Sequence, residues 1–283
     1  MNTPNHYRTI VLSDIHLGTK GSKAKEVTRF LKMNTADTLI LNGDIIDGWQ
    51  LKKSGEWKRK HTKFMQRVLK MMSNHHTKVI YLRGNHDDFL EQFIPMRIGD
   101  LHLVLEWIYE GANGKKYLVT HGDIFDSVTS KMAWLAKLGD IGYTFLLWLN
   151  RIYNEYRSKR GLPYYSLSQA IKAKVKQAVS YISDYEEKLV GLAESKNCQG
   201  IICGHIHQPV IKQYGNIEYL NSGDWVESLS ALVEDFNGEW SLVYYTDSKT
   251  SNMHDIVADS NDDEDDEADL PMDLISIQKR LSA

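Results

Sequence analysis

The sequence has little cysteine and no long hydrophobic run, and each shortage excludes a class of protein. Cys198 and Cys203 are the only cysteines in 283 residues, too few for a disulfide framework or a zinc cluster built from several thiolates. The most apolar long segment, Ile141 to Leu149, has about half of the ~20 residues that a membrane-spanning helix needs. The start of the chain has no apolar core of a secretory signal. We therefore expect a soluble cytoplasmic protein.

The net charge of −3 at pH 7 is also small, but it hides an asymmetry. Residues 251–283 carry ten acidic and two basic side chains, a net charge of −8, which leaves +5 on residues 1–250. That modest positive charge suits an anionic substrate or a membrane surface, but it is no footprint of nucleic-acid binding. We expect no nucleic-acid partner. The acidic segment is predicted to be a disordered, solvated tail.

The first 125 residues alternate between strand-like and helix-like segments. Amphipathic helical stretches at 23–33 and 56–72 lie between apolar runs typical of strands. This alternation predicts an α/β fold with a buried sheet. From residue 200 onward the strand-like runs and the hairpin signal Asn237-Gly238 predict antiparallel β structure. The predicted strands are 9–13, 38–42, 78–83, 101–108, 117–120, 200–203, 210–213, 218–220, 229–233 and 241–245.

Residues 126–196 break this pattern because they contain no strand-like run. Apolar side chains between Trp134 and Ile152 recur at steps of three and four, the spacing of a helical stripe. Gly161-Leu162-Pro163 interrupts the chain, and a second helix is expected over about 166–194. We therefore predict one domain over residues 1–250, with 126–196 as a helical insertion and 251–283 as the tail.

Five short polar motifs each follow one of the apolar, strand-like runs. In open α/β sheets the carboxyl ends of the strands converge on the ligand crevice, so the five motifs are expected to meet at one edge. Each motif alone has a structural explanation, such as a turn or a satisfied core histidine, but the ordered set indicates a metal site. The motifs are Ser13-Asp14-Ile15-His16, Gly43-Asp44, Gly84-Asn85-His86-Asp87, His121-Gly122-Asp123 and Gly204-His205-Ile206-His207.

The candidate ligands in these motifs are two aspartates, one asparagine and four histidines, too many for one tetrahedral ion. Two ions that share Asp44 would each receive four protein ligands. Imidazole and oxygen ligands without thiolate favour Mn²⁺, with Fe or Zn²⁺ as alternatives, over Ca²⁺. Two such ions, roughly 3.5–4 Å apart, can stabilise the attacking and leaving oxygens of a phosphoryl transfer. The candidate metal ligands are Asp14, His16, Asp44, Asn85, His121, His205 and His207.

The ordered set D-x-H, G-D, G-N-H-D, H and G-H-x-H resembles the calcineurin-like metallophosphoesterase superfamily over about residues 14–245, the insertion excluded. The resemblance implies an α/β (α+β) fold in which a two-sheet β sandwich is flanked by helices and carries a dinuclear site at the strand edge. It also implies how the ligands divide. One metal would be held by Asp14, His16, Asp44 and His207, and the other by Asp44, Asn85, His121 and His205.

The resemblance further implies catalytic roles for His86 and Asp87. His86 would contact the scissile phosphoryl group and protonate the leaving oxygen or stabilise its charge, with Asp87 orienting the imidazole. Asn85 and His205 would contact the substrate together with His86. A structural alternative for Asp87 is that it caps the turn that follows it.

The stretches SDIHLG, GDIIDGW, YLRGNHDDFL, HGDIFD, GHIHQP and NSGDWVES resemble the branch that contains UDP-2,3-diacylglucosamine diphosphatases of lipid A biosynthesis. That branch implies hydrolysis of a UDP-linked lipid pyrophosphate to UMP and a lipid phosphate, with metal-activated water attacking the α-phosphorus. The best-known lipid A enzymes of the branch have arginine at the position of His86. A phosphoesterase with a soluble diester or monoester substrate, and a non-catalytic scaffold on the same fold, are the alternatives.

The insertion suits a lipid-linked substrate. Residues 126–195 contain ten aromatic and ten basic residues, a composition that an amphipathic lid at a membrane interface would have. Such a lid would cover the acyl chains and hold the protein peripherally on the inner face of the cytoplasmic membrane. The alternatives are a helical hairpin packed on the body and a contact between the subunits of a homodimer.

Overall fold

The computed structural model describes residues 4–125 except 54, seven positions between 151 and 161, and residues 167–246, with side chains from residue 180 onward in the last range. The predicted acidic tail at 251–283 lies outside the described residues, and so does almost all of the first predicted helix of the insertion. Within the described part of the chain, no helix is both long enough and apolar enough to cross a bilayer.

A seven-stranded sheet forms the first layer of strands, in the order β12-β11-β1-β2-β3-β5-β4. Its central strands β1, β2, β3 and β5 are parallel. Consecutive residues Ile10, Val11 and Leu12 are all fully buried, which means that both faces of the sheet are covered. The bounds are β1 Asn5–Leu12, β2 Asn34–Asn42, β3 Lys78–Leu82, β4 Met96–Ile98, β5 Leu101–Val104, β11 Ser230–Glu234 and β12 Trp240–Tyr244.

A second sheet of five strands, in the order β6-β7-β8-β10-β9, packs against the inner face of the first. Val11 and Ile40 of the first sheet share one buried cluster with Val119, Ile202 and Leu220 of the second, so the two sheets form a sandwich. The bounds are β6 Glu106–Glu110, β7 Lys116–Thr120, β8 Gly200–Cys203, β9 Val210–Tyr214 and β10 Ile217–Asn221.

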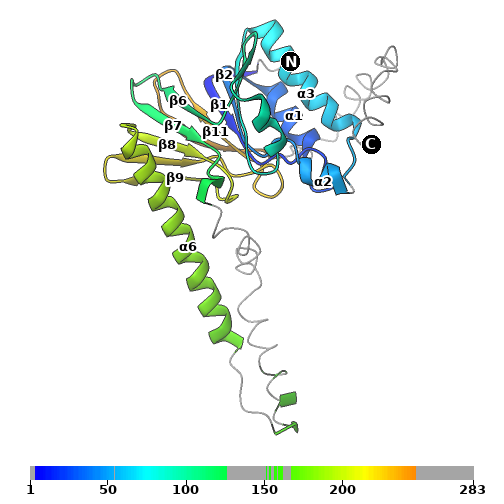
Figure 1. Ribbon diagram of the computed structural model, residues 1–283, viewed down its shortest axis with the longest axis vertical. Coiled ribbons are helices and arrows are strands. Elements are labelled where there is room, and N and C mark those ends of the chain that lie inside the picture. Colours follow the sequence, from blue (N-terminus) through cyan, green and yellow to red (C-terminus); the bar gives the residue numbers. More distant parts are fainter. Residues whose placement is uncertain are drawn as a thin grey trace. The chain divides into compact units, whose positions relative to one another are not determined.

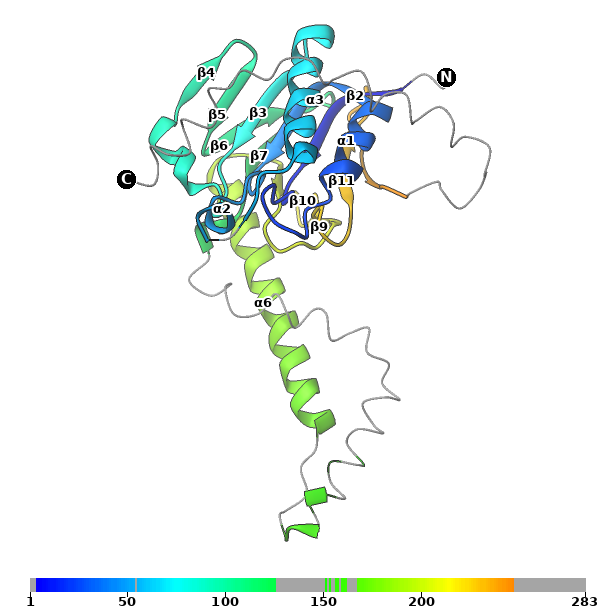
Figure 2. The same cartoon turned by 90° about the vertical axis from the view of Figure 1, so that its right-hand side faces the viewer.

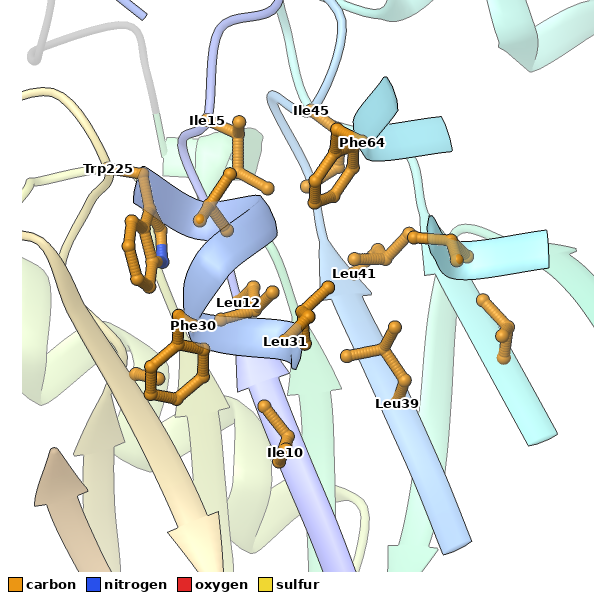
Figure 3. Close-up of a cluster of buried hydrophobic side chains, with 14 of the residues drawn as sticks. Ile10, Leu12, Ile15, Phe30, Leu31, Leu39, Leu41, Ile45, Phe64 and Trp225 are labelled. Atoms are coloured by element: carbon orange, nitrogen blue, oxygen red, sulfur yellow. The ribbon is translucent and has the colours of Figure 1, made fainter. Parts of the chain in front are cut away.

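Helices cover the outer face of the seven-stranded sheet, where α1 (Ala24–Met33) and α3 (Arg59–His75) lie side by side (Figures 1 and 2). Phe64, Val68 and Met71 of α3 are buried at helical spacing, as an amphipathic helix requires. Figure 3 shows how Phe30 and Phe64 meet the outward side chains of β1 and β2. The short helix α2 (Gly48–Lys53) follows β2.

The second sheet is covered by α6 (Leu167–Ser195), the counterpart of the second helix predicted in the insertion. Its buried residues Tyr185, Leu189 and Ala193 follow at steps of four and pack on Ile201 and Tyr219 of β8 and β10. Two helical turns, η1 (Asp88–Phe93) and η2 (Asp123–Phe125), follow β3 and β7. Two sheets flanked by helices confirm the predicted fold class.

Two expectations about the strands were wrong. The run 101–108 is not one strand: β5 and β6 belong to different sheets, and Leu105 between them is 46% exposed. The chain after residue 200 is not simply antiparallel, because β8 pairs parallel with both β7 and β10. The crossover that makes β7 and β8 parallel runs through α6, which separates them in sequence.

Candidate metal centre

The predicted ligands follow five parallel strands, three from one sheet and two from the other. Asp14 and His16 follow β1, Asp44 follows β2, and Asn85 follows β3. His121 follows β7, and His205 and His207 follow β8. Three groups of side chains could each hold a metal ion, because within each group the ligand atoms lie within 4.8 Å of one another. These groups are Asp14, His16 and His207; His16, Asp44 and His86; and Asp44, His121 and His205. Because the groups share His16 and Asp44, they form one continuous cluster.

The backbone turns that carry these ligands have an unusual conformation. Asp14, His16, Asp44, His205 and His207 all have φ between 50° and 68°, the left-handed region that non-glycine residues rarely adopt. Each such residue costs of order 1–3 kcal/mol and persists only where the surroundings enforce it. Five strained residues in one cluster indicate a built site.

The same turns explain the D-x-H and H-x-H spacings. In each tripeptide the first and third residues have positive φ and belong to the cluster. The middle residue is apolar and packs in the interior: Ile15 is fully buried, and Ile206 packs against the core beneath α6. The alternation therefore sends two polar side chains to the site for each apolar side chain that anchors the turn.

Glycine precedes several ligands because the chain segments approach closely. A Cβ on Gly84 would lie 2.3 Å from Oδ1 of Asp44, and a Cβ on Gly43 would lie 2.3 Å from Nδ1 of His121. Neither position has room for a side chain, and Gly43 also has φ of 80°. The Gly-Asp and Gly-Asn pairs are therefore steric requirements of the cluster.

Each of the two aspartates divides its oxygens between backbone and imidazole. Oδ2 of Asp14 accepts from the backbone N–H of His205 at 3.0 Å, and Oδ1 lies 3.2 Å from Nε2 of His207. Oδ1 of Asp44 accepts from the backbone N–H of His86 at 2.8 Å. Its Oδ2 lies 3.4 Å from Nε2 of His121 and 3.9 Å from Nε2 of His16. One oxygen of each carboxylate fixes its orientation, and the other faces histidine nitrogens.

The histidine rings are oriented from behind. Nδ1 of His121 lies 2.9 Å from the carbonyl oxygen of Asn42, which only accepts, so Nδ1 carries a proton and Nε2 is the ring nitrogen that faces Asp44. Nδ1 of His16 lies 3.3 Å from Oδ2 of Asp47. Such outer partners are typical of metal-binding histidines.

Unpaired buried atoms show that the cluster fits cations. Oδ1 of Asn85 is buried with no hydrogen-bond partner among the described residues, and Oδ1 of Asp14 and Nε2 of His121 are buried with only an ion-pair neighbour and no well-aligned hydrogen bond. Each such atom costs about 1–3 kcal/mol when it stays unsatisfied. Coordination to a divalent cation would satisfy all three, and oxygen and imidazole donors without thiolate suit Mn²⁺, Fe or Zn²⁺.

The pKa values show how strongly these groups interact. Burial alone would lower the pKa of His207, but Asp14 raises it to about 9. Burial would likewise lower the pKa of His121, yet Asp44 and Asp14 hold it well above its usual range. For Asp14 burial would raise the pKa, and His207, His121 and His16 lower it instead. The cluster thus favours ionised carboxylates and bound positive charge.

His86 lies at the edge of the cluster, with its side chain 26% exposed. Its Nδ1 is 3.1 Å from Oδ2 of Asp47, and its ring lies 4.4 Å from the ring of Trp49, centroid to centroid. Burial would lower the pKa of His86, but Asp47 and Asp44 raise it overall. A protonated imidazole beside the cluster can donate a proton or stabilise negative charge on an oxygen.

Asp47 is the site residue that sequence reasoning missed. Its Oδ2 faces both His16 and His86, while Oδ1 accepts the backbone N–H of Gln50 at 2.8 Å and caps α2. Burial would raise the pKa of Asp47, and the two histidines lower it. The signal was present in the stretch GDIIDGW, where Asp47 follows Asp44 by three residues.

The structure corrects the expectation that Asp87 orients His86. Oδ1 of Asp87 accepts from the backbone N–H of Gly84, and Oδ2 accepts from the N–H of Ile45 at 3.1 Å and the hydroxyl of Tyr81 at 2.7 Å. Asp87 is fully buried. It therefore joins the turn after β3 to the turn after β2, and Asp47 is the carboxylate beside His86. Asp87 also does not cap the following turn with its side chain.

Helix α6 reaches the cluster through Tyr185, whose ring lies 6.3 Å from the ring of His205, centroid to centroid. A cavity beside it is lined by Phe125, Tyr181, Asp184, Tyr185 and Lys188. The described end of the predicted insertion thus borders the metal centre.

Sandwich and site together define a metal-dependent hydrolase of phosphoric esters. The model of the calcineurin-like phosphoesterase family matches residues 7–209, and the chain belongs to this family.

Its curated relatives include UDP-2,3-diacylglucosamine hydrolases. The one from Shewanella sp. (strain ANA-3) is 26% identical over 250 residues, which covers 82% of this chain and 95% of the relative. The one from Shewanella halifaxensis is 26% identical over 239 residues, with 80% and 93% covered. Among solved structures, a phosphoesterase from E. coli, Yfce, matches with a TM-score of 0.39 and 16% identity, covering 84% of this chain and 99% of its own.

Proposed function

We propose that this protein hydrolyses the pyrophosphate of UDP-2,3-diacylglucosamine, or of a similar nucleotide-linked lipid, to UMP and a lipid phosphate. The cluster of aspartates and histidines at the ends of five strands carries this proposal. The curated relatives support the substrate, because they align over almost their whole length and are named UDP-2,3-diacylglucosamine hydrolases. The reaction would belong to lipid A biosynthesis.

The ligand sets proposed for two divalent cations are those that the family resemblance implies, and the short distances within the cluster support them. Asp14, His16, Asp44 and His207 would hold one ion, and Asp44, Asn85, His121 and His205 the other. Mn²⁺ is the ion we propose, and Fe or Zn²⁺ would suit the same donors. When bound, such ions supply Lewis acidity toward the phosphoryl oxygens and lower the pKa of water.

The remaining residues of the site would act on the substrate directly. His86 would donate its proton to the leaving oxygen, or stabilise the charge there, and Asp47 would hold the imidazole in the required orientation. Asn85, which precedes His86 in the chain, and His205, whose ring lies beside that of Tyr185, would contact the phosphoryl oxygens. Asp87 would keep the turn that carries Asn85 and His86 in place.

We further propose that residues 1–250 form one catalytic domain and that the insertion at 126–196 is a lid over the acyl chains. The position of α6 beside His205 supports this role. The enzyme would act in the cytoplasm, peripherally on the inner face of the cytoplasmic membrane, either as a monomer or as a homodimer that the insertion joins.

The test is a ³¹P NMR assay with UDP-2,3-diacylglucosamine and Mn²⁺ in H₂¹⁸O. The proposal expects UMP and the lipid phosphate, with ¹⁸O on the UMP because water attacks the α-phosphorus. An Asp44→Ala variant is the control for contaminating activity. If the protein hydrolyses small chromogenic phosphodiesters but leaves the UDP-lipid uncleaved, the proposed substrate is wrong. A soluble phosphoester would then be the favoured substrate.

A further inference from the structure

Six exposed lysines lie in the two chain segments that follow the ligand turns of His16 and Asp44. Three follow the turn of His16, and three lie on α2 and just before α3. Within residues 18–25 and 48–59, Glu56 is the single acidic residue, and it pairs with Lys58 at 3.3 Å. We call this surface the basic rim; its members are Lys20, Lys23, Lys25, Lys52, Lys53 and Lys58.

The segments of the basic rim form one continuous surface. Nζ of Lys60 donates to the carbonyl of Ser22 at 2.7 Å, which ties the start of α3 to the loop after β1. The backbone N–H of Gly55 donates to Gln50 at 2.6 Å, and a Cβ on Gly55 would touch the carbonyl of Gly18. The linker between α2 and α3 therefore lies against the same loop.

The lysines are close enough to repel one another. Burial lowers the pKa of Lys60, and Lys58, Lys23 and Lys25 lower it further, although Glu26 acts in the opposite sense. Lys58, Lys23 and Lys25 thus all lie near the ammonium group of Lys60. Such a surface has a standing attraction for an anionic partner.

Two half-exposed tryptophans lie within the basic rim. Trp49 is 42% exposed and Trp57 is 40% exposed. Tryptophan favours the headgroup region of a bilayer, and lysines around it add attraction to anionic lipids. Trp49 also lies against His86, so the basic rim adjoins the metal centre.

We propose that the basic rim binds the anionic headgroups of a phospholipid bilayer and turns the metal centre toward the membrane. This deepens the proposed function, because a lipid-linked substrate would then reach the site from the same surface. Lysine predominates among these cations, and Arg59 is the one exposed arginine in the two stretches. A bilayer therefore fits better than a nucleic acid, because lysines attract a diffuse anionic surface whereas arginines read phosphates in fixed geometry. Each lysine near the membrane is worth about fivefold in binding.

Cosedimentation with vesicles tests the proposal, using the full chain with Mn²⁺ and without any nucleotide-linked lipid. Phosphatidylcholine vesicles with and without phosphatidylglycerol are compared for the wild type, Lys52→Glu/Lys53→Glu and Lys32→Glu/Lys70→Glu. The last variant is the matched control, because Lys32 and Lys70 are exposed at the far ends of α1 and α3 and it makes the same change in charge. Unchanged thermal melting and Mn²⁺ content verify that each variant folds.

We expect the wild type to bind only vesicles that contain phosphatidylglycerol, and less strongly as salt rises. Lys52→Glu/Lys53→Glu should weaken this binding at least about tenfold, and the control by much less. Equal binding to both kinds of vesicle, no binding by the wild type, or equal losses in the two variants would overturn the proposal. Tighter binding to an oligonucleotide at the same salt would do so too.

The outcome is independent of the substrate. The vesicle assay measures binding without any hydrolysis. The hydrolysis assay uses the UDP-lipid dispersed in neutral detergent, where no anionic surface is present. Failure of one therefore leaves the other standing.

Discussion

Oδ2 of Asp47 lies 3.1 Å from Nδ1 of His86, and the same oxygen lies 3.3 Å from Nδ1 of His16. One carboxylate thus faces a candidate metal ligand and the candidate proton donor together. This relationship couples the ligand cluster to the residue that would act on the leaving group. It also separates the roles of Asp47 and Asp87, which the first three predictions test.

Asp47→Asn should lower kcat by about 10²–10³-fold, because His86 loses the charge that holds and orients its ring. Asp47 raises the pKa of His86, so its removal should lower that pKa. The alkaline limb of the kcat profile, where His86 loses its proton, should therefore move to lower pH. Asp100→Asn is the matched control, since Asp100 is exposed between β4 and β5 at the edge of the seven-stranded sheet. An unmoved limb in Asp47→Asn would show that Asp47 is only structural.

His86→Ala should keep its metal ions but lose about 10²–10⁴-fold in kcat, the contribution of a general acid or charge-stabilising donor. The loss should be smaller for a p-nitrophenyl ester of UMP than for an alkyl ester, because nitrophenolate leaves without a proton. Steady-state kinetics on both esters measures the difference. Equal losses would rule out proton donation, and wild-type turnover would remove His86 from catalysis.

Asp87→Asn should act on stability rather than on proton transfer. Asparagine has one side-chain oxygen where Asp87 has two. At least one of the buried donors on Gly84, Ile45 and Tyr81 therefore loses its acceptor. We expect the free energy of unfolding in urea to fall by about 2–3 kcal/mol. The alkaline limb of kcat should stay where it is in the wild type. A shifted limb with unchanged stability would return Asp87 to the role first expected for it.

His61 should make the protein less stable in mild acid. Burial and the nearby lysines lower its pKa from 6.5 to about 4, so the unfolded chain binds a proton there that the folded chain rejects. This contribution to stability is complete above pH 6.5 and is lost as the pH falls toward 4. In His61→Gln, glutamine can still accept the N–H of Lys58 at the start of α3 but does not titrate. Urea unfolding of both proteins across this range should show a smaller slope for the variant; equal slopes would contradict the prediction.

Much of the site could be predicted because parallel strands deliver their carboxyl ends to one edge. The apolar runs before Asp14, Asp44, Asn85, His121 and His205 are strands, and polar side chains that follow all five of them, His86 after the third, come together in one cluster. The sequence did not show that two sheets share the task. That arrangement depends on which strands pair, and pairing is decided by contacts between residues distant in sequence.

The parts that failed depend on local turns and on distant partners. Proximity in sequence suggested that Asp87 serves His86, but the turn after β3 directs Asp87 inward to backbone donors. Asp47 reaches His86 from another strand end, which no spacing within one motif reveals. Likewise the run 101–108 contains no glycine or proline to mark a break, although β5 and β6 pair in different sheets.

The central claim is that the seven residues hold two cations around a shared Asp44, and calorimetric titration of the metal-free protein with Mn²⁺ tests it most directly. We predict two ions per wild-type chain, one in His207→Ala, which belongs to one ligand set, and none bound tightly in Asp44→Ala, which belongs to both. Two ions retained by Asp44→Ala, or fewer than one bound by the wild type, would contradict the account.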